Sequence, residues 1–173
     1  MIQVTVITVG NLKESYWRDA VSEYEKRLSA FCKPTLIQLK ESKVPDDPSD
    51  GEIRSALADE GKRILAAMPP RSYRVALCVE GKQFSSEELA ARLESALTEQ
   101  GHLCLVIGSS HGLAPEVKEG CQLRLSVSKL TFPHQLMRVI LLETVYRAFN
   151  IQKGPRYHKY KHTLTSLALY AII

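Results

Sequence analysis

The sequence predicts a single α/β domain with a mainly parallel sheet flanked by helices. Strand-like and helical segments alternate along the whole chain, which is the pattern of parallel α/β sheets. The apolar runs Val75–Val79 and Leu103–Ile107 are uninterrupted, as is typical of strands that are buried on both faces. A chain of 173 residues with 45% hydrophobic and 24% charged residues is also suited to one globular core.

The first half of the chain contains two strands and two helices. The expected order is a strand at Ile2–Val9, a helix at Lys13–Ala30, a strand at Pro34–Leu39, a polar loop at Glu41–Gly51 and a helix at Glu52–Met68. The first strand alternates apolar and polar residues and is closed by Gly10. Both helices have apolar residues at helical spacing, and Pro69 and Pro70 end the second one.

The second half continues the alternation. The expected order is a strand at Tyr73–Val79, a helix from Ser85 to about Glu99, a strand at Leu103–Ile107, a loop at Gly108–Gly112, a helical turn at Pro115–Glu119, a strand at Leu123–Val127 and a helix at Pro133–Phe149. Gly81 is expected to end the first of these strands, and Ser85 with Glu88 forms a capping box. Pro133 is expected in the first turn of the last helix, where proline is tolerated.

Ligands of such sheets bind at the carboxyl ends of the strands. These ends are expected at Leu77–Gly81, Ile107–Gly112 and Val127–Thr131. The dinucleotide fingerprint and the Walker phosphate loop are both missing. The turn Gly108–Gly112 either lets a ligand approach the backbone or is purely structural. The segment Ser126–His134 is either a ligand-holding loop with free backbone groups or a tight strand-to-helix connection.

The helix Pro133–Phe149 is apolar almost all round, whereas a surface helix needs only one apolar stripe. We therefore expect its own sheet on one side and a second subunit on the other. Glu143 and Arg147 are four residues apart in the favourable order for an ion pair.

Positive charge is concentrated at the end of the chain. The segment Lys129–His162 has seven basic residues and one acid, while the whole chain has a net charge of +4. Such a local excess favours a polyanionic partner. Tyr157 and His158 lie among Arg156, Lys159 and Lys161, a mixture of aromatic and basic residues that suits RNA but also fits a solvated basic tail.

The four cysteines Cys32, Cys78, Cys104 and Cys121 lack the spacing of a zinc site, so we expect buried free thiols in a reducing cytoplasm and no metal. The start of the chain reads as a strand rather than a signal peptide, and the apolar end Leu164–Ile173 is too short for a membrane helix. We expect a cytoplasmic protein without membrane contact.

Taken together, these residues resemble the ribosomal RNA large-subunit methyltransferase H (RlmH) group of the SPOUT methyltransferases. The similarity runs from Ile2 to about Lys159, so residues 1–159 are expected to be one SPOUT domain and 160–173 an atypical extension. The matching positions are Val4–Gly10, Tyr24–Leu28, Glu60-Gly61, Leu77, Gly81-Lys82, Val106–Gly108, Gly112-Leu113, Ser128–His134, Arg138, Glu143, Tyr146–Ala148 and Tyr157-His158.

The resemblance implies a homodimer with a deep C-terminal trefoil knot that binds S-adenosylmethionine. It further implies N3-methylation of a pseudouridine in the intersubunit-bridge stem-loop of 23S rRNA on assembled ribosomes. The implied cofactor-binding residues are Leu77, Gly108, Val127, Ser128, Lys129, Leu130, Thr131 and Phe132. Ser109 stands where the family usually has a second glycine, and must accept that glycine's backbone geometry.

The expected catalytic residues are His158, Tyr157 and Arg147. His158 would position the substrate or handle its proton, Tyr157 would stack on the base, and Arg147 would hold phosphate or favour the deprotonated ring. Arg156, Lys159 and Arg138 are the expected RNA-binding residues, and His134 is expected to be structural. The alternatives are a non-catalytic RNA- or ribosome-binding protein of the same fold and a tRNA methyltransferase.

Overall fold

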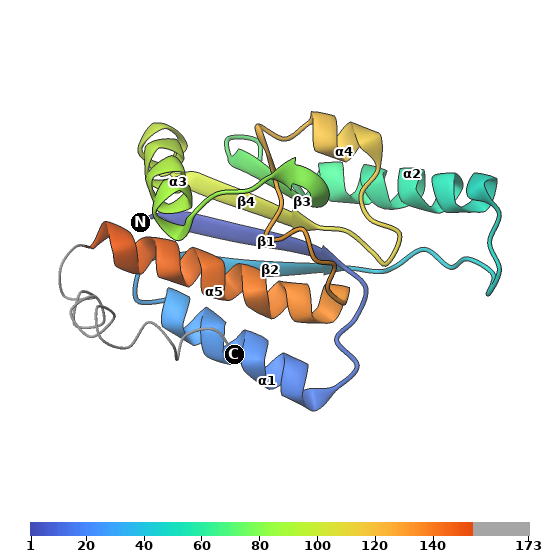
Figure 1. The fold of residues 1–173 in the computed structure, drawn as a ribbon, viewed down its shortest axis with the longest axis horizontal. Coiled ribbons are helices and arrows are strands. Elements are labelled where there is room, and N and C mark those ends of the chain that lie inside the picture. The colour runs from blue at the N-terminus through green and yellow to red at the C-terminus, as the bar shows by residue number, and fades with distance from the viewer. Residues whose placement is uncertain (154–173) are drawn as a thin grey trace.

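Five strands and five helices alternate through residues 1–153, the part of the chain that the computed structural model describes (Figure 1). In chain order they are β1 Gln3–Val9, α1 Ser15–Leu28, β2 Lys33–Leu39, α2 Asp50–Ala67, β3 Tyr73–Lys82, α3 Ser86–Gln100, β4 His102–Ile107, α4 Pro115–Glu119, β5 Leu123–Leu125 and α5 His134–Gln152. Every predicted element is present, so the prediction of element order is confirmed.

The strands form one parallel sheet in the order β2-β1-β4-β3-β5. Val6 of the interior strand β1 pairs with Leu36 of β2 on one side and with Leu105 of β4 on the other. All the carboxyl ends therefore lie at the same edge of the sheet. The α/β class with a parallel sheet is confirmed, while the deep trefoil knot stays a prediction.

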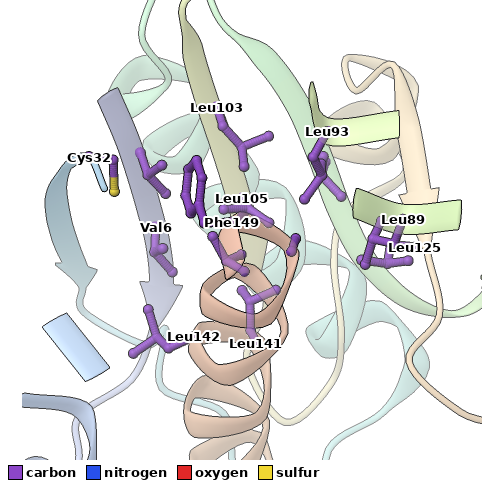
Figure 2. Close-up of a cluster of buried hydrophobic side chains, with 14 of the residues drawn as sticks. Val6, Cys32, Leu89, Leu93, Leu103, Leu105, Leu125, Leu141, Leu142 and Phe149 are labelled. Carbon is purple, nitrogen blue, oxygen red and sulfur yellow. The ribbon is translucent and has the colours of Figure 1, made fainter. Parts of the chain in front are cut away.

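Helices cover both faces of the sheet, as Figure 1 shows for α2 and α4 on one side and for α1 and α5 on the other. Side chains alternate along β1, so Val4 and Val6 join the apolar cluster beneath α1, α3 and α5. Ile7 and Val9 join the second cluster, beneath α2 and α4. Figure 2 shows the first cluster, in which Leu141, Leu142 and Phe149 of α5 pack with residues of the sheet.

The predicted ends of two strands next to the cleft described below are wrong. Gly81 does not end β3, because that strand continues to Lys82. A Cβ at Gly81 would lie 2.5 Å from the backbone carbon of Leu125, so only glycine permits this close approach of β3 and β5. β5 ends at Leu125, and the next amide, of Ser126, donates to the carbonyl of Lys82 at 3.0 Å.

The start of α5 also differs from the prediction by one position. Pro133 has extended backbone angles, with φ −54° and ψ 136°, and is the N-cap residue rather than part of the first turn. The helix starts at His134 and continues beyond Phe149 to Gln152. Its neighbours in the same face of the domain are α1 and α3.

The capping box of α3 is confirmed: the hydroxyl of Ser85 accepts from the amide of Glu88 at 3.1 Å, and the Glu88 carboxylate accepts from the amide of Ser85 at 2.8 Å. We expect Ser85→Ala to lower the free energy of unfolding by about 1 kcal/mol, because it orphans one amide at the helix start. Urea denaturation measures this loss. Ser86→Ala, one position later, is the matched control and should change stability by less than about 0.5 kcal/mol.

All four cysteines are free thiols, but only two of them are buried. Burial raises the pKa of Cys104 to about 12 and that of Cys32 to about 11. Cys78 and Cys121 are only half-buried, which corrects the expectation for these two residues. Between residues 1 and 153, no helix combines the length and apolar character needed to cross a membrane.

Candidate active site

A cleft of about 540 Å³ opens at the carboxyl ends of β3, β4 and β5. This volume lies in the range of small-molecule and cofactor sites, roughly 300–1,000 Å³. The cleft is bordered by residues 77–80, 107–113, 125–128 and 130–134, together with Lys118 of α4 and Met137 of α5. Three segments that are far apart in the sequence therefore meet at one place, as predicted from the parallel sheet.

Seven of the eight residues expected to bind a cofactor border this cleft: Leu77, Gly108, Val127, Ser128, Leu130, Thr131 and Phe132. The eighth, Lys129, is exposed and does not border it. Apolar side chains of this set can enclose a flat ring, and the loop backbone can supply donors and acceptors. This combination fits a nucleoside-containing cofactor such as S-adenosylmethionine.

The loop after β4 folds so closely on itself that a side chain at Gly108 has no room. A Cβ there would lie 1.9 Å from the carbonyl oxygen of Gly112. The amide of Gly112, whose φ is +93°, donates to the carbonyl of Ser109 at 3.0 Å. Ser109 is 7% exposed and its φ is not positive, so this position does not require glycine. The serine is thus compatible with the loop geometry.

The loop before α5 is held by two serine hydroxyls. Ser126, which is buried, donates to the carbonyl of Ser128 at 2.9 Å. The Ser128 hydroxyl in turn accepts from the amide of Leu130 at 3.0 Å. Each of these hydrogen bonds joins residues that are only two positions apart, so together they fix a local turn of the loop. Leu130, 70% exposed, forms an apolar part of the rim.

A pair of opposite charges lies on the rim of the cleft. Lys118 Nζ of α4 donates to Glu80 Oε1 of β3 at 2.5 Å. This hydrogen bond is the main reason that the pKa of Glu80 lies below its usual value. Lys118 and Glu80 are 38 positions apart and no motif joins them, so the sequence does not predict this pair. His111 and His134, which belong to the predicted segments Gly108–Gly112 and Ser126–His134, also border the cleft.

Two of the predicted site residues on α5 do not border the cleft. Arg147 is exposed and forms an ion pair with Glu143. It lies thirteen residues after His134, about 20 Å further along the helix axis. Arg138 is 4% exposed, and its Nη2 donates to the carbonyls of Val9 at 2.8 Å and Gly10 at 2.7 Å. The structure therefore gives Arg138 a role in joining α5 to β1, and contact with RNA remains a prediction.

The remaining predicted site residues are Arg156, Tyr157, His158 and Lys159. They lie outside the described residues, as does the extension 160–173.

Comparison with known protein families agrees with this geometry. A family model described as "Predicted SPOUT methyltransferase" matches residues 2–158, which is nearly the whole chain. The matched range includes all three segments of the cleft. Methyltransferases of this family generally use S-adenosylmethionine as the methyl donor. The chain thus belongs to the SPOUT methyltransferase family.

Proposed function

We propose that the chain is an S-adenosylmethionine-dependent methyltransferase of 23S rRNA. Its substrate is a pseudouridine in the intersubunit-bridge stem-loop, methylated at N3 on assembled ribosomes in the cytoplasm. The observation that carries the proposal is the convergence on one cleft of seven residues assigned from the resemblance to the RlmH group. The basic excess of Lys129–His162, which begins in the same loop, provides charge for docking on RNA.

In this reaction the cofactor supplies an electrophilic methyl group on a sulfonium sulfur, and the protein supplies position and electrostatics. The loops around Gly108 and Ser128 would hold the cofactor. Aligning the acceptor nitrogen with the methyl carbon can contribute an effective molarity on the order of 10⁵ M. In our proposal Tyr157 and His158 position the base, while Arg147, Arg156 and Lys159 contact the RNA backbone.

We also propose that the active protein is a homodimer. The side of α5 that faces away from the sheet includes Leu136 and Ile140, which are only half-buried within one chain. Apolar residues that a single chain leaves partly open are typical of a subunit interface. Ile140→Glu should therefore give monomers in sedimentation experiments, whereas a monomeric wild-type protein would rule the homodimer out.

The decisive experiment compares acceptors. Purified protein and methyl-labelled S-adenosylmethionine are incubated with assembled ribosomes, naked 23S rRNA and tRNA. We expect labelling of ribosomes alone, at one methyl group per large subunit. Labelling of tRNA would instead favour a tRNA methyltransferase. No labelling together with no saturable cofactor binding would favour a non-catalytic RNA-binding protein of the same fold.

His158→Ala tests the proposed role of the tail. We expect turnover on ribosomes to fall by about 10² or more, since positioning of the reacting base is lost. The affinity for S-adenosylmethionine, measured by calorimetry, should be unchanged, because the proposed cofactor residues precede the tail. His162→Ala, four residues further on, is the matched control. Unchanged turnover in the His158 variant would refute this assignment.

A further inference from the structure

The rim of the cleft holds one carboxylate and one ammonium group that are in direct contact. Glu80 lies near the end of β3 and Lys118 near the end of α4, so two separate elements supply the pair. Lys118 Nζ donates to Glu80 Oε1 at 2.5 Å, and both side chains border the cleft. Among the described residues around the cleft, no other side chain is a carboxylate, an ammonium or a guanidinium. These charges of the cleft are therefore confined to one place.

The contact leaves both groups with hydrogen-bonding capacity. A lysine ammonium has three donors, and a carboxylate has two oxygens that accept. One hydrogen bond joins the two groups, and within residues 1–153 Glu80 Oε2 and the other donors of Lys118 bond to no further residue. The Lys118 side chain is 24% exposed and that of Glu80 is 55% exposed. An incoming polar group can therefore reach both without breaking the contact between them.

This pair is better suited to a zwitterion than to a single ion. A lone cation or anion would be attracted by one member and repelled by the other, since the two opposite charges are adjacent. A ligand with an ammonium beside a carboxylate can place each charge on its opposite, through charge-assisted hydrogen bonds. An α-amino acid has these two groups on the same carbon. The pKa of Glu80 lies below its usual value, mainly because Lys118 donates to it, so the carboxylate is charged at neutral pH.

The rest of the cleft suits an uncharged ligand part. Leu77, Ile107 and Phe132 supply apolar surface, and the loop at Ser126–Leu130 supplies backbone donors and acceptors. S-adenosylmethionine has a nucleoside at one end and an α-amino acid at the other, joined through sulfur. With the nucleoside in the apolar part, its amino-acid end requires a place with both charges. The contact of Glu80 with Lys118 is such a place.

We propose that Glu80 and Lys118 bind the amino-acid end of S-adenosylmethionine. The Glu80 carboxylate accepts from the α-ammonium, and the Lys118 ammonium donates to the α-carboxylate. The inference rests on the proposed function and adds two binding residues to those that the family resemblance implies. It also explains why this pair lies on the cleft, because an ion pair this exposed adds little to the stability of the fold. The pair makes the cleft selective for the whole cofactor over a nucleoside that lacks the amino acid.

The test compares two ligands by calorimetry. S-adenosylhomocysteine has the amino acid, and 5′-deoxy-5′-methylthioadenosine has the same nucleoside and a thioether without it. Both are uncharged at sulfur, so the substituted charges act on the amino acid alone. We expect Lys118→Met and Glu80→Gln each to weaken S-adenosylhomocysteine binding about tenfold. Binding of methylthioadenosine should change less than about twofold.

A double variant and two controls exclude indirect effects. Lys118→Met combined with Glu80→Gln leaves no unpaired charge on the rim, and should still weaken S-adenosylhomocysteine binding about tenfold or more. Glu119→Gln removes an exposed carboxylate from the same helix, α4, and Lys62→Met removes an exposed ammonium from α2. Neither side chain borders the cleft, so both controls should bind the two ligands as the wild type does.

Each outcome decides between the proposals. Equal losses for the two ligands, or unchanged S-adenosylhomocysteine binding in the double variant, would overturn the inference and leave the proposed function standing. Equal affinity of the wild-type protein for the two ligands would do the same, because the amino acid would then contribute nothing. A wild-type protein that binds neither ligand would overturn the proposed function and the inference together.

Discussion

Replacing Gly108 by alanine is expected to weaken cofactor binding severely. The new Cβ would lie 1.9 Å from the carbonyl oxygen of Gly112 and 2.4 Å from its carbonyl carbon, so backbone rather than a flexible side chain must move. The segment that moves is one of the three that form the cleft. We expect the affinity for S-adenosylmethionine, measured by calorimetry, to fall at least about 100-fold, or roughly 2.7 kcal/mol. The free energy of unfolding should also fall by about 2–4 kcal/mol.

The control for this substitution is Gly101→Ala. Gly101 also has a positive φ, +68°, but no atom lies within 4 Å of the position of its Cβ, and it ends α3 away from the cleft. The substitution should cost about 1–2 kcal/mol of stability through backbone strain alone and leave the cofactor affinity unchanged. If Gly108→Ala bound the cofactor as tightly as wild type, the assignment of this cleft would be wrong.

The order of the elements could be predicted from the sequence because each carries a local signal. The capping box of Ser85 and Glu88 marks the start of α3, and the uninterrupted apolar run Leu103–Ile107 marks a strand buried on both faces. Parallel strands then bring their carboxyl ends to one edge, which was enough to predict three segments of the cleft. Local patterns and general topology therefore account for much of the site.

Other features depend on contacts between distant residues and leave no local signal. Gly81 looks like the end of a strand, yet it lies within β3 because the backbone of Leu125 passes so closely beside it. Arg138 looks like a surface cation in a basic segment, yet it is buried against carbonyls 128 and 129 positions away. Glu41 and Arg138 are 97 positions apart in the sequence, yet the folded chain brings both within 4 Å of the position that a Cβ on Gly10 would take.

The orientation of helix α5 could not be predicted from its sequence either. The helix is apolar almost all round, so periodicity alone could not identify the side that packs on the sheet. The structure assigns that side to residues including Leu141, Leu142, Val145 and Phe149. This orientation also determines the position of His134 at the cleft, because the first turn and the buried turns belong to one rigid helix. The packing of the core and the geometry of the site are therefore coupled.

Leu141→Ala, a core substitution on this helix, is expected to be strongly destabilising. The Leu141 side chain is 0% exposed and lies in the cluster between α5 and the sheet (Figure 2). Removing three carbon atoms there leaves a cavity in addition to losing buried apolar surface. We expect the free energy of unfolding in urea to fall by about 3 kcal/mol, within the usual range of 2–5 kcal/mol.

Leu65→Ala is the matched control, since it makes the same chemical change on α2, where the side chain is 38% exposed. It should cost about 1 kcal/mol or less, because the surroundings and water can fill the space. Equal losses at the two positions would contradict the orientation of α5. The comparison also bears on the site: because α5 carries His134 into the cleft, Leu141→Ala should weaken S-adenosylmethionine binding in conditions where Leu65→Ala does not.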